Sequence, residues 1–299
     1  MIDRSMSKQR DFTQGSIFRH LVLFSGPIML TDLLQTSYQI VDSLWIGNLL
    51  GANALGAVAV SSAIIFTILS FVIGLNNATL AILSQQKGRD DQEGLRKYLN
   101  AFVVTLSCLV IVLSIGGLVL TEPLLHLLGT PSAMFQDAKV YLQINFVGIV
   151  FLVGYNFISA VLRSIGDSNT PLKFVTIAVI LNVFLDPLFI AGFNLGISGA
   201  AYATILSQGV AFIYGVFFVL KNKLVPFTRP HKPQWKEVST ILHVGIPSGL
   251  QMAVISAGLA AIMSVVTMFG GGVVAGFSAA QRLNSLIMLP AQAFSIAVT

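Results

Sequence analysis

Long apolar stretches, separated by short polar connections, run through the whole chain and constrain its fold more than any other feature. Residues 98–120 and 197–220 contain no charged side chain, and each is long enough to cross a bilayer, which takes about 20 helical residues. Within a bilayer only helices and closed barrels can pair all of their backbone groups. The stretches lack the alternating pattern of barrel strands, so we expect an all-α polytopic membrane protein.

The composition agrees with this class. Of 299 residues, 55% are hydrophobic and 10% are charged, whereas soluble domains carry about 25% charged residues. The sequence predicts about eight transmembrane helices, at residues 18–48, 54–84, 98–120, 138–162, 172–193, 197–220, 238–269 and 273–299.

Basic residues alternate between the connections. Of the 17 Lys and Arg residues, 15 lie in the N-terminal segment or in the connections that follow the second, fourth and sixth spans. The remaining connections hold only Lys139. This positive-inside pattern predicts a cytoplasmic N-terminus in the cell membrane. The net charge of +5 is therefore explained by the basic residues that set the orientation of the chain in the membrane. We expect the lipid bilayer as a partner, and no nucleic acid.

Motifs for enzymatic chemistry are missing from the sequence. Cys108 is the single cysteine, and the four histidines are scattered, so neither a disulfide framework nor a metal cluster is expected. The sequence contains no phosphate-binding loop, no HExxH motif and no GxSxG motif. We expect a protein that is not an enzyme and carries no cofactor.

The chain repeats itself at an offset of 220 residues. Identical residues occur at Pro27 and Pro247, Leu30 and Leu250, Gly51 and Gly271, Gly56 and Gly276, Ala59 and Ala279, and Thr79 and Thr299. Six predicted spans separate the copies, so the repeats are parallel, as in transporters whose substrate path lies between two halves. We expect a six-helix lobe at 1–220, a cytoplasmic linker at 221–237, and the first two helices of a truncated second lobe at 238–299.

A polar stripe runs along the first span. Asp32, Gln35, Gln39 and Asp42 are spaced by three, four and three residues, which places them on one helix face, with Tyr38 beside them. A carboxylate at the centre of a membrane helix costs at least ~2.5 kcal/mol, so the stripe should face other helices or water. The alternative is a structural seam of interhelical hydrogen bonds, above all for Asp32, which lies nearer the membrane surface.

The fifth span supplies a second acid. Asn182 and Asp186 share a face, and Pro187 should loosen the helix beside them. Carboxylates, amides and freed carbonyls can ligate a small hard cation, or two close acids can share one proton, because both cannot be charged cheaply. A capped, broken helix is the structural alternative. In the second repeat the position of Asp42 is Ile262, so the titratable chemistry belongs to the first lobe.

Four stretches carry a resemblance to a known family. They read GPIMLTDLLQTSYQIVDSLWIGNLLGANALGAVAVS, VLRSIGDSNTPLKF, ILNVFLDPLFIAGFNLGISGAAYAT and GIPSGLQ. They resemble the multidrug and toxic compound extrusion (MATE) family, above all its DinF-like bacterial and archaeal branch. The resemblance implies twelve helices in two lobes, of which this chain is an N-terminal fragment. It also implies a monomer that exports cationic or amphipathic drugs in exchange for H+ or Na+.

The resemblance also implies a site in the first lobe. The residues that couple transport to the ion, and that could hold Na+, would be Asp42, Asp186, Asn182 and Thr204. The substrate cavity would be lined by Gln35, Tyr38, Tyr141, Asn156 and Asp32. The alternative function is a flippase for a lipid-linked or amphipathic substrate. Such a protein should carry several cations in its cavity, whereas the predicted spans offer Arg282 and few others.

Overall fold

The computed structural model describes residues 16–226, 230–267, 269 and 271–298. Within these residues the chain forms eight α-helices and one π-helix and contains no strand. The elements are α1 (Ile17–Leu50), α2 (Ala52–Gly88), α3 (Gln92–Leu127), α4 (Ser132–Ser164), α5 (Asn169–Pro187), η2 (Leu188–Gly192), α6 (Ile197–Lys221), α7 (Trp235–Thr267) and α8 (Gly271–Val298). The predicted all-α class is therefore confirmed.

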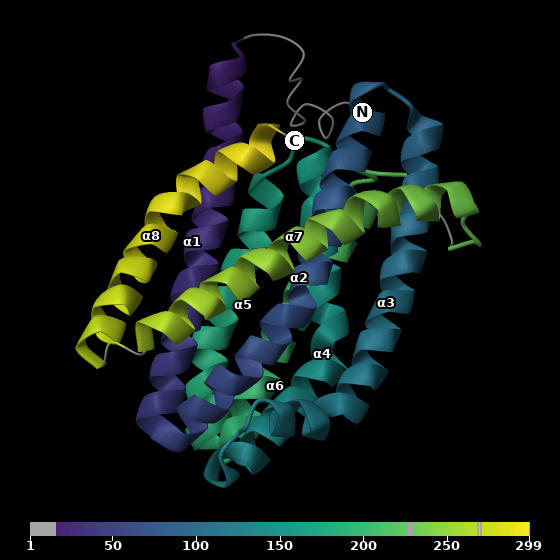
Figure 1. Ribbon diagram of the computed structural model, residues 1–299. Helices are drawn as coiled ribbons and strands as arrows, with labels where there is room; N and C mark the ends of the chain where they lie inside the picture. Colours follow the sequence, from purple (N-terminus) through teal and green to yellow (C-terminus); the bar gives the residue numbers. More distant parts are fainter. Residues whose placement is uncertain (1–15, 227–229, 268, 270, 299) are drawn as a thin grey trace.

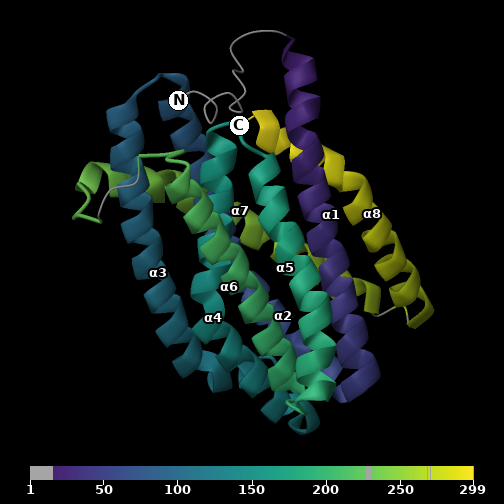
Figure 2. The ribbon, with the colours of Figure 1, turned by 180° about the vertical axis from the view of Figure 1, so that it is seen from behind.

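Helices α1 to α6 form one elongated bundle, and α7 and α8 lie against its outside (Figure 1). Helix α7 crosses α2 diagonally, and α8 runs beside α1. The view from behind shows α5 between α1 and α6 (Figure 2), which agrees with the packing of α5 against both helices. This arrangement brings the first and fifth predicted spans side by side, as a site shared by their acids requires.

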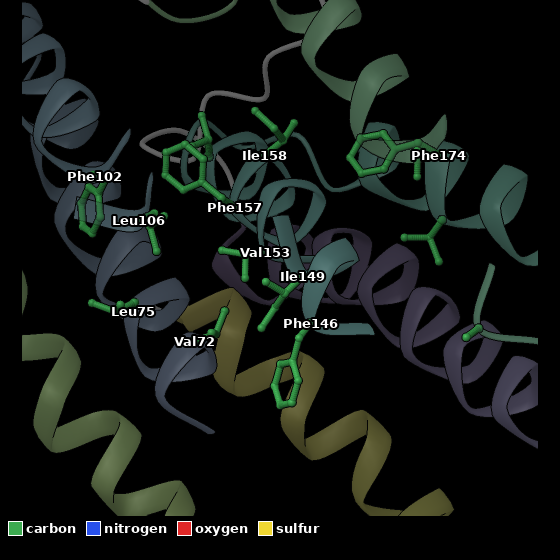
Figure 3. Packing of buried hydrophobic residues seen from close by; sticks show 14 of the residues in the cluster. Val72, Leu75, Phe102, Leu106, Phe146, Ile149, Val153, Phe157, Ile158 and Phe174 are labelled. Carbon is green, nitrogen blue, oxygen red and sulfur yellow. The ribbon is translucent and has the colours of Figure 1, made fainter. Parts of the chain in front are cut away.

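The apolar core lies mainly between α2, α3, α4 and α6. Figure 3 shows Phe102 and Leu106 of α3 opposite Val153 and Phe157 of α4. The rings of Phe102 and Phe157 have centroids 6.4 Å apart and are tilted by 40°, an arrangement that aromatic pairs favour. These buried side chains hold α4 in place, and α4 in turn supports the face of the bundle that carries the polar residues.

Six helices are long and apolar enough to cross a membrane: α2, α3, α4, α5 with η2, α6, and α7. Helix α1, at the predicted span 18–48, is not among these six helices within the described residues. Helix α8 has a shorter apolar part, Asn284–Val298. The bundle also exposes large apolar side chains such as Phe184 and Val112, which are 70% and 66% exposed. Such exposure in a helical bundle indicates a surface that faces lipid.

Helix α5 begins at a tight turn that is organised by Asp167. Its Oδ1 atom accepts hydrogen bonds from the backbone N–H groups of Asn169 and Thr170 at 3.0 and 2.9 Å, and its Oδ2 accepts one from the Thr170 hydroxyl. Gly166 precedes it with φ of 87°, a conformation that suits glycine. The side chain thus satisfies backbone donors that the first turn of a helix leaves unpaired.

Replacing Asp167 with Ala should lower the free energy of unfolding by about 1 kcal/mol, the usual cost of losing such a cap. Thermal unfolding of the purified protein in detergent would measure this loss. The matched control is Asn169→Ala at the next exposed position, because that variant keeps the backbone N–H that Asp167 binds. Equal midpoints for the two variants would contradict the capping role.

Helix α5 changes its geometry at Pro187, as the sequence predicts. The α-helix ends at this residue and continues directly as the π-helix η2. Proline has no N–H group and its ring clashes with the preceding turn, so the regular ladder cannot continue through it. The wider turn of η2 closes through the Phe193 N–H, which donates to the Leu188 carbonyl at 2.9 Å. The break lies one residue after Asp186.

Candidate functional site

Two buried acids meet where α1 packs against α5. Asp42 lies on α1 and is 8% exposed, while Asp186 lies at the end of α5 and is fully buried. Asn182, one turn before Asp186, is also fully buried. The carboxyl groups of Asp42 and Asp186 lie close enough to form a hydrogen bond through one shared proton. The local sequence placed each acid on a helix, and the contact between α1 and α5 makes them a pair.

The hydrogen bonds of this group leave several oxygen atoms unused. The Asn182 Nδ2 donates to the Asp186 Oδ1 at 3.0 Å. Asp42 Oδ1, Asn182 Oδ1 and Asp186 Oδ2 are buried and accept no hydrogen bond. Unpaired buried acceptors are costly, so these three oxygens favour an arriving proton or a small cation. Within the described residues no group of three His, Cys, Asp or Glu side chains could hold a metal ion.

Helix α6 completes the group with a hydroxyl. The Tyr38 hydroxyl of α1 donates to the Thr204 Oγ1 of α6 at 3.1 Å. The charges of both acids act on the phenols of Tyr38 and of Tyr141, a buried residue of α4. Three other helices therefore surround the end of α5 with polar groups. We name this set, Asp42, Asp186, Asn182, Thr204, Tyr38 and Tyr141, the acid-pair site.

Because the sequence predicts a transporter, we expect replacement of Tyr38 with Phe to weaken substrate transport without unfolding the protein. The change removes one neutral hydrogen bond, worth about 0.5–1.5 kcal/mol, and keeps the aromatic ring. We expect the apparent substrate affinity in an efflux assay to fall by up to roughly ten-fold, since about 1.4 kcal/mol corresponds to that factor. The control is Tyr202→Phe, because Tyr202 lies on the outer face of α6 and is 47% exposed. Matching affinities in the two variants would contradict a role for the Tyr38 hydroxyl.

Other residues of the predicted cavity gather elsewhere. Asp32 interacts through charge with Arg163 and Tyr155 on α4. The Asn156 Nδ2 donates to the Leu152 carbonyl of its own helix at 2.8 Å. Asp32 lies ten residues before Asp42, about 15 Å along the helix axis. The structure thus places Asp32 beside α4 side chains rather than with the acid pair, and the Asn156 amide is bound to its own helix. Gln35 lies half-buried between the two groups on α1.

The polar stripe of α1 is not buried along its whole length. Asp42 is buried and Asp32 and Gln35 are half-buried, but Gln39 is exposed. Helical spacing places residues on one face but does not tell how much of that face a neighbouring helix covers. Here the cover provided by α5 and α6 includes Asp42 and leaves out Gln39.

Arg163 is a polar residue near Asp32 that the sequence analysis does not single out as a site residue. It is half-buried on α4, and its Nε has no hydrogen-bond partner. The sequence counts it among basic loop residues, because it precedes the turn at Gly166. Its position in VLRSIG, directly after the apolar span 138–162, is the sequence feature that could have marked it as a buried charge. The side chain of Arg282, which bears on the flippase alternative, lies outside the described residues.

A close contact between two backbones positions α6 beside the acid pair. A Cβ atom placed on Gly199 of α6 would lie 2.7 Å from the carbonyl carbon and 2.8 Å from the carbonyl oxygen of Phe189 in η2. The π-helix can therefore rest directly on the first turns of α6. This contact fixes the position of Thr204 along the bundle axis relative to Asp186. Thr204 lies less than two turns after Gly199, and Asp186 lies about one turn before Phe189.

Comparison with known proteins assigns the chain to a family. The MatE family model matches residues 27–188, which is more than half of the chain and includes Asp42, Asn182 and Asp186. The chain belongs to the MatE family. Multi-pass transporters make up this family, so the predicted family and membrane class are confirmed.

Three similar proteins illustrate the family relationship. The chain is 61% identical to the probable multidrug resistance protein YpnP of Bacillus subtilis and 27% identical to an FAD transporter of Shewanella oneidensis, over 97% of this chain and 65% of each relative. It also resembles the outward-facing structure of a multidrug resistance MATE family transporter of the MOP superfamily, with a TM-score of 0.90, 28% identity, and the same two coverages. The chain thus spans about two thirds of these relatives.

Proposed function

We infer that the transporter containing this chain is a secondary antiporter of the cytoplasmic membrane. It exports cationic or amphipathic drug-like compounds in exchange for H+ or Na+. The observation that carries this inference is the acid-pair site, in which three buried oxygens from Asp42, Asn182 and Asp186 accept no hydrogen bond. A buried carboxylate pair is the kind of group that membrane proteins use to bind protons or ions.

The exchange arises because the substrate and the coupling ion compete for the same negatively charged carboxylates. With both carboxylates ionised, the site repels anions and attracts an organic cation. A bound proton or Na+ removes that attraction, because it neutralises one carboxylate and occupies the shared oxygens. Each ligand then favours the conformation in which it binds more tightly, so one displaces the other through differential affinity.

The residues around the acids suit amphipathic cations. Tyr38 and Tyr141 offer aromatic rings beside the carboxylates, and aromatic faces attract cations. Gln35 and Asn156 add amides further along the same lobe. The name of the 61% identical relative, a probable multidrug resistance protein, supports the same substrate class. The parallel repeat supports alternating access between two lobes, with the N-terminus in the cytoplasm.

The decisive experiment separates the two coupling ions. The full-length transporter would be placed in liposomes loaded with ethidium, an organic cation, and given either a Na+ gradient at clamped pH or a pH gradient in Na+-free buffer. Transport driven by the first gradient alone identifies Na+ at the acid-pair site, and transport driven by the second alone identifies protons. A protein that moves ethidium equally with no gradient, or not at all with either, would contradict the antiporter.

A further inference from the structure

One face of α6 is exposed along most of the helix. Its exposed side chains are apolar or aromatic and recur every three or four residues, at Tyr202, Leu206, Val210, Ile213, Phe217 and Leu220. Residues with this spacing lie on one side of a helix, whereas other faces of α6 pack against α4 and α5. We name this exposed set of six residues the α6 stripe.

The α6 stripe has the length of a lipid-facing surface. Figures 1 and 2 show α6 and α7 on opposite sides of the bundle. The helix rises about 28 Å from Tyr202 to Lys221, close to the ~30 Å thickness of the hydrocarbon core. A helix that crosses the bilayer with this stripe in the acyl chains therefore places Lys221 among the lipid headgroups.

Lysine and aromatic side chains meet where the α6 stripe ends. The Lys221 Nζ lies over the Phe217 ring, 5.5 Å from its centroid, and Phe217 is 60% exposed. Tyr214 and Phe218 form a second aromatic pair nearby, with ring centroids 6.3 Å apart. At a membrane interface, rings of this kind contact acyl chains while the lysine ammonium reaches the headgroups. This end of the stripe has the chemistry of a headgroup site.

The turn after α6 holds a second lysine on the surface. Lys223 is exposed and has φ of 49°, a left-handed conformation that glycine usually takes directly after a helix. The Leu224 N–H donates to the Val219 carbonyl at 3.2 Å, and the chain then returns to the core, where Val225 is buried. The backbone alone favours glycine here, so it does not account for the lysine.

This part of the chain contains no acid that could balance its lysines. The sequence from Pro187 to Lys236 has five Lys and Arg residues and no Asp or Glu. By contrast, Lys97 pairs with Glu93 of its own helix at 2.6 Å. A basic segment without acids attracts anions, and anionic phospholipids give the cytoplasmic leaflet its negative surface potential. The charge of this segment therefore complements an anionic headgroup.

We propose that the end of α6 binds an anionic phospholipid of the cytoplasmic leaflet. The ammonium groups of Lys221 and Lys223 contact the headgroup phosphate, and the acyl chains lie along Ile213 and Phe217. The site lies about 25 Å along α6 from Thr204, so it is separate from the acid-pair site. The choice of leaflet rests on the orientation inferred above, whereas binding of the lipid does not.

Two phospholipids with different headgroup charge test the proposal. The full-length transporter in detergent would be titrated with phosphatidylglycerol, which is anionic, or phosphatidylcholine, which has no net charge. Native mass spectrometry would count the bound lipids. We expect tighter binding of phosphatidylglycerol. The double variant Lys221→Gln with Lys223→Gln should lose roughly 25-fold in this affinity, about five-fold for each lysine. Its binding of phosphatidylcholine should not change.

The matched control is Lys232→Gln with Lys236→Gln, which removes two exposed lysines from the linker instead. The control should bind phosphatidylglycerol as the unmodified protein does. An equal loss in both double variants would show attraction by net charge alone and would overturn the site. Unchanged binding in the α6 variant would also overturn it, as expected if another helix of the full-length transporter covers the stripe. Equal affinities for the two lipids in the unmodified protein would show an apolar contact only.

Thermal unfolding provides a second measurement. A ligand that binds the folded state raises the unfolding midpoint, so phosphatidylglycerol should stabilise the unmodified protein and the linker control more than the α6 variant. Midpoints raised equally in all three proteins would contradict the site. These measurements need no transport and no ion gradient, so failure of the lipid site leaves the antiporter standing, and failure of the antiporter leaves the lipid site standing.

Discussion

The variant Asp42→Asn should lose ion-coupled efflux while it folds and inserts normally. Asparagine has nearly the same shape and can donate a hydrogen bond to Asp186, as a protonated Asp42 would. It cannot gain or lose a proton, and it removes one charge from any cation site. A ligand that binds both conformations equally does not shift the equilibrium between them. The ion would therefore no longer drive export. Typical coupling free energies correspond to a loss of roughly 5–150-fold.

Ethidium accumulation in cells that express the full-length transporter would measure this loss. The matched control is Gln39→Asn, which changes an exposed residue three positions earlier on the same helix. The control should export ethidium as well as the unmodified protein, at equal expression. Normal efflux by Asp42→Asn would remove Asp42 from the coupling site and would leave Asp186 to act alone.

The variant Gly199→Ala should destabilise the protein and disturb the acid-pair site together. Its new Cβ would lie 2.7–2.9 Å from backbone atoms of Phe189 and Ile190, and backbone cannot give way as a side chain can. Overpacking of this kind costs about 1–3 kcal/mol, which exceeds the ~0.5–1 kcal/mol that alanine gains over glycine within a helix. Moving α6 away from η2 should also lengthen the bond between Tyr38 and Thr204 and weaken substrate binding.

Gly209, a second glycine of α6, provides the matched control. A Cβ atom on Gly209 would lie 3.6 Å from the nearest atoms of Phe151, an ordinary contact, so Gly209→Ala should be neutral or slightly stabilising. Thermal unfolding in detergent would compare the two variants, and ethidium binding would follow the site. Equal unfolding midpoints would show that the contact between Gly199 and η2 does not limit stability.

The sequence determined the features that depend on neighbouring residues. Apolar length predicted the helices, because backbone groups in lipid must be paired within a span. The four-residue spacing of Asn182 and Asp186 predicted a shared face, and the structure joins them by a hydrogen bond of 3.0 Å. Pro187 predicted the break in α5, because proline lacks the N–H group that the helix needs.

Only the tertiary structure decided which helix faces meet. Tyr38 and Thr204 are 166 residues apart and share a hydrogen bond, and no local pattern could have paired them. The same holds for Asp32, which interacts through charge with Arg163 of α4 and not with the acid pair. Helical periodicity fixes the direction of a side chain around its own axis. The height and rotation of one helix against another depend on distant contacts such as Gly199 on Phe189 and Gly74 on Gly249, because close packing allows only certain arrangements.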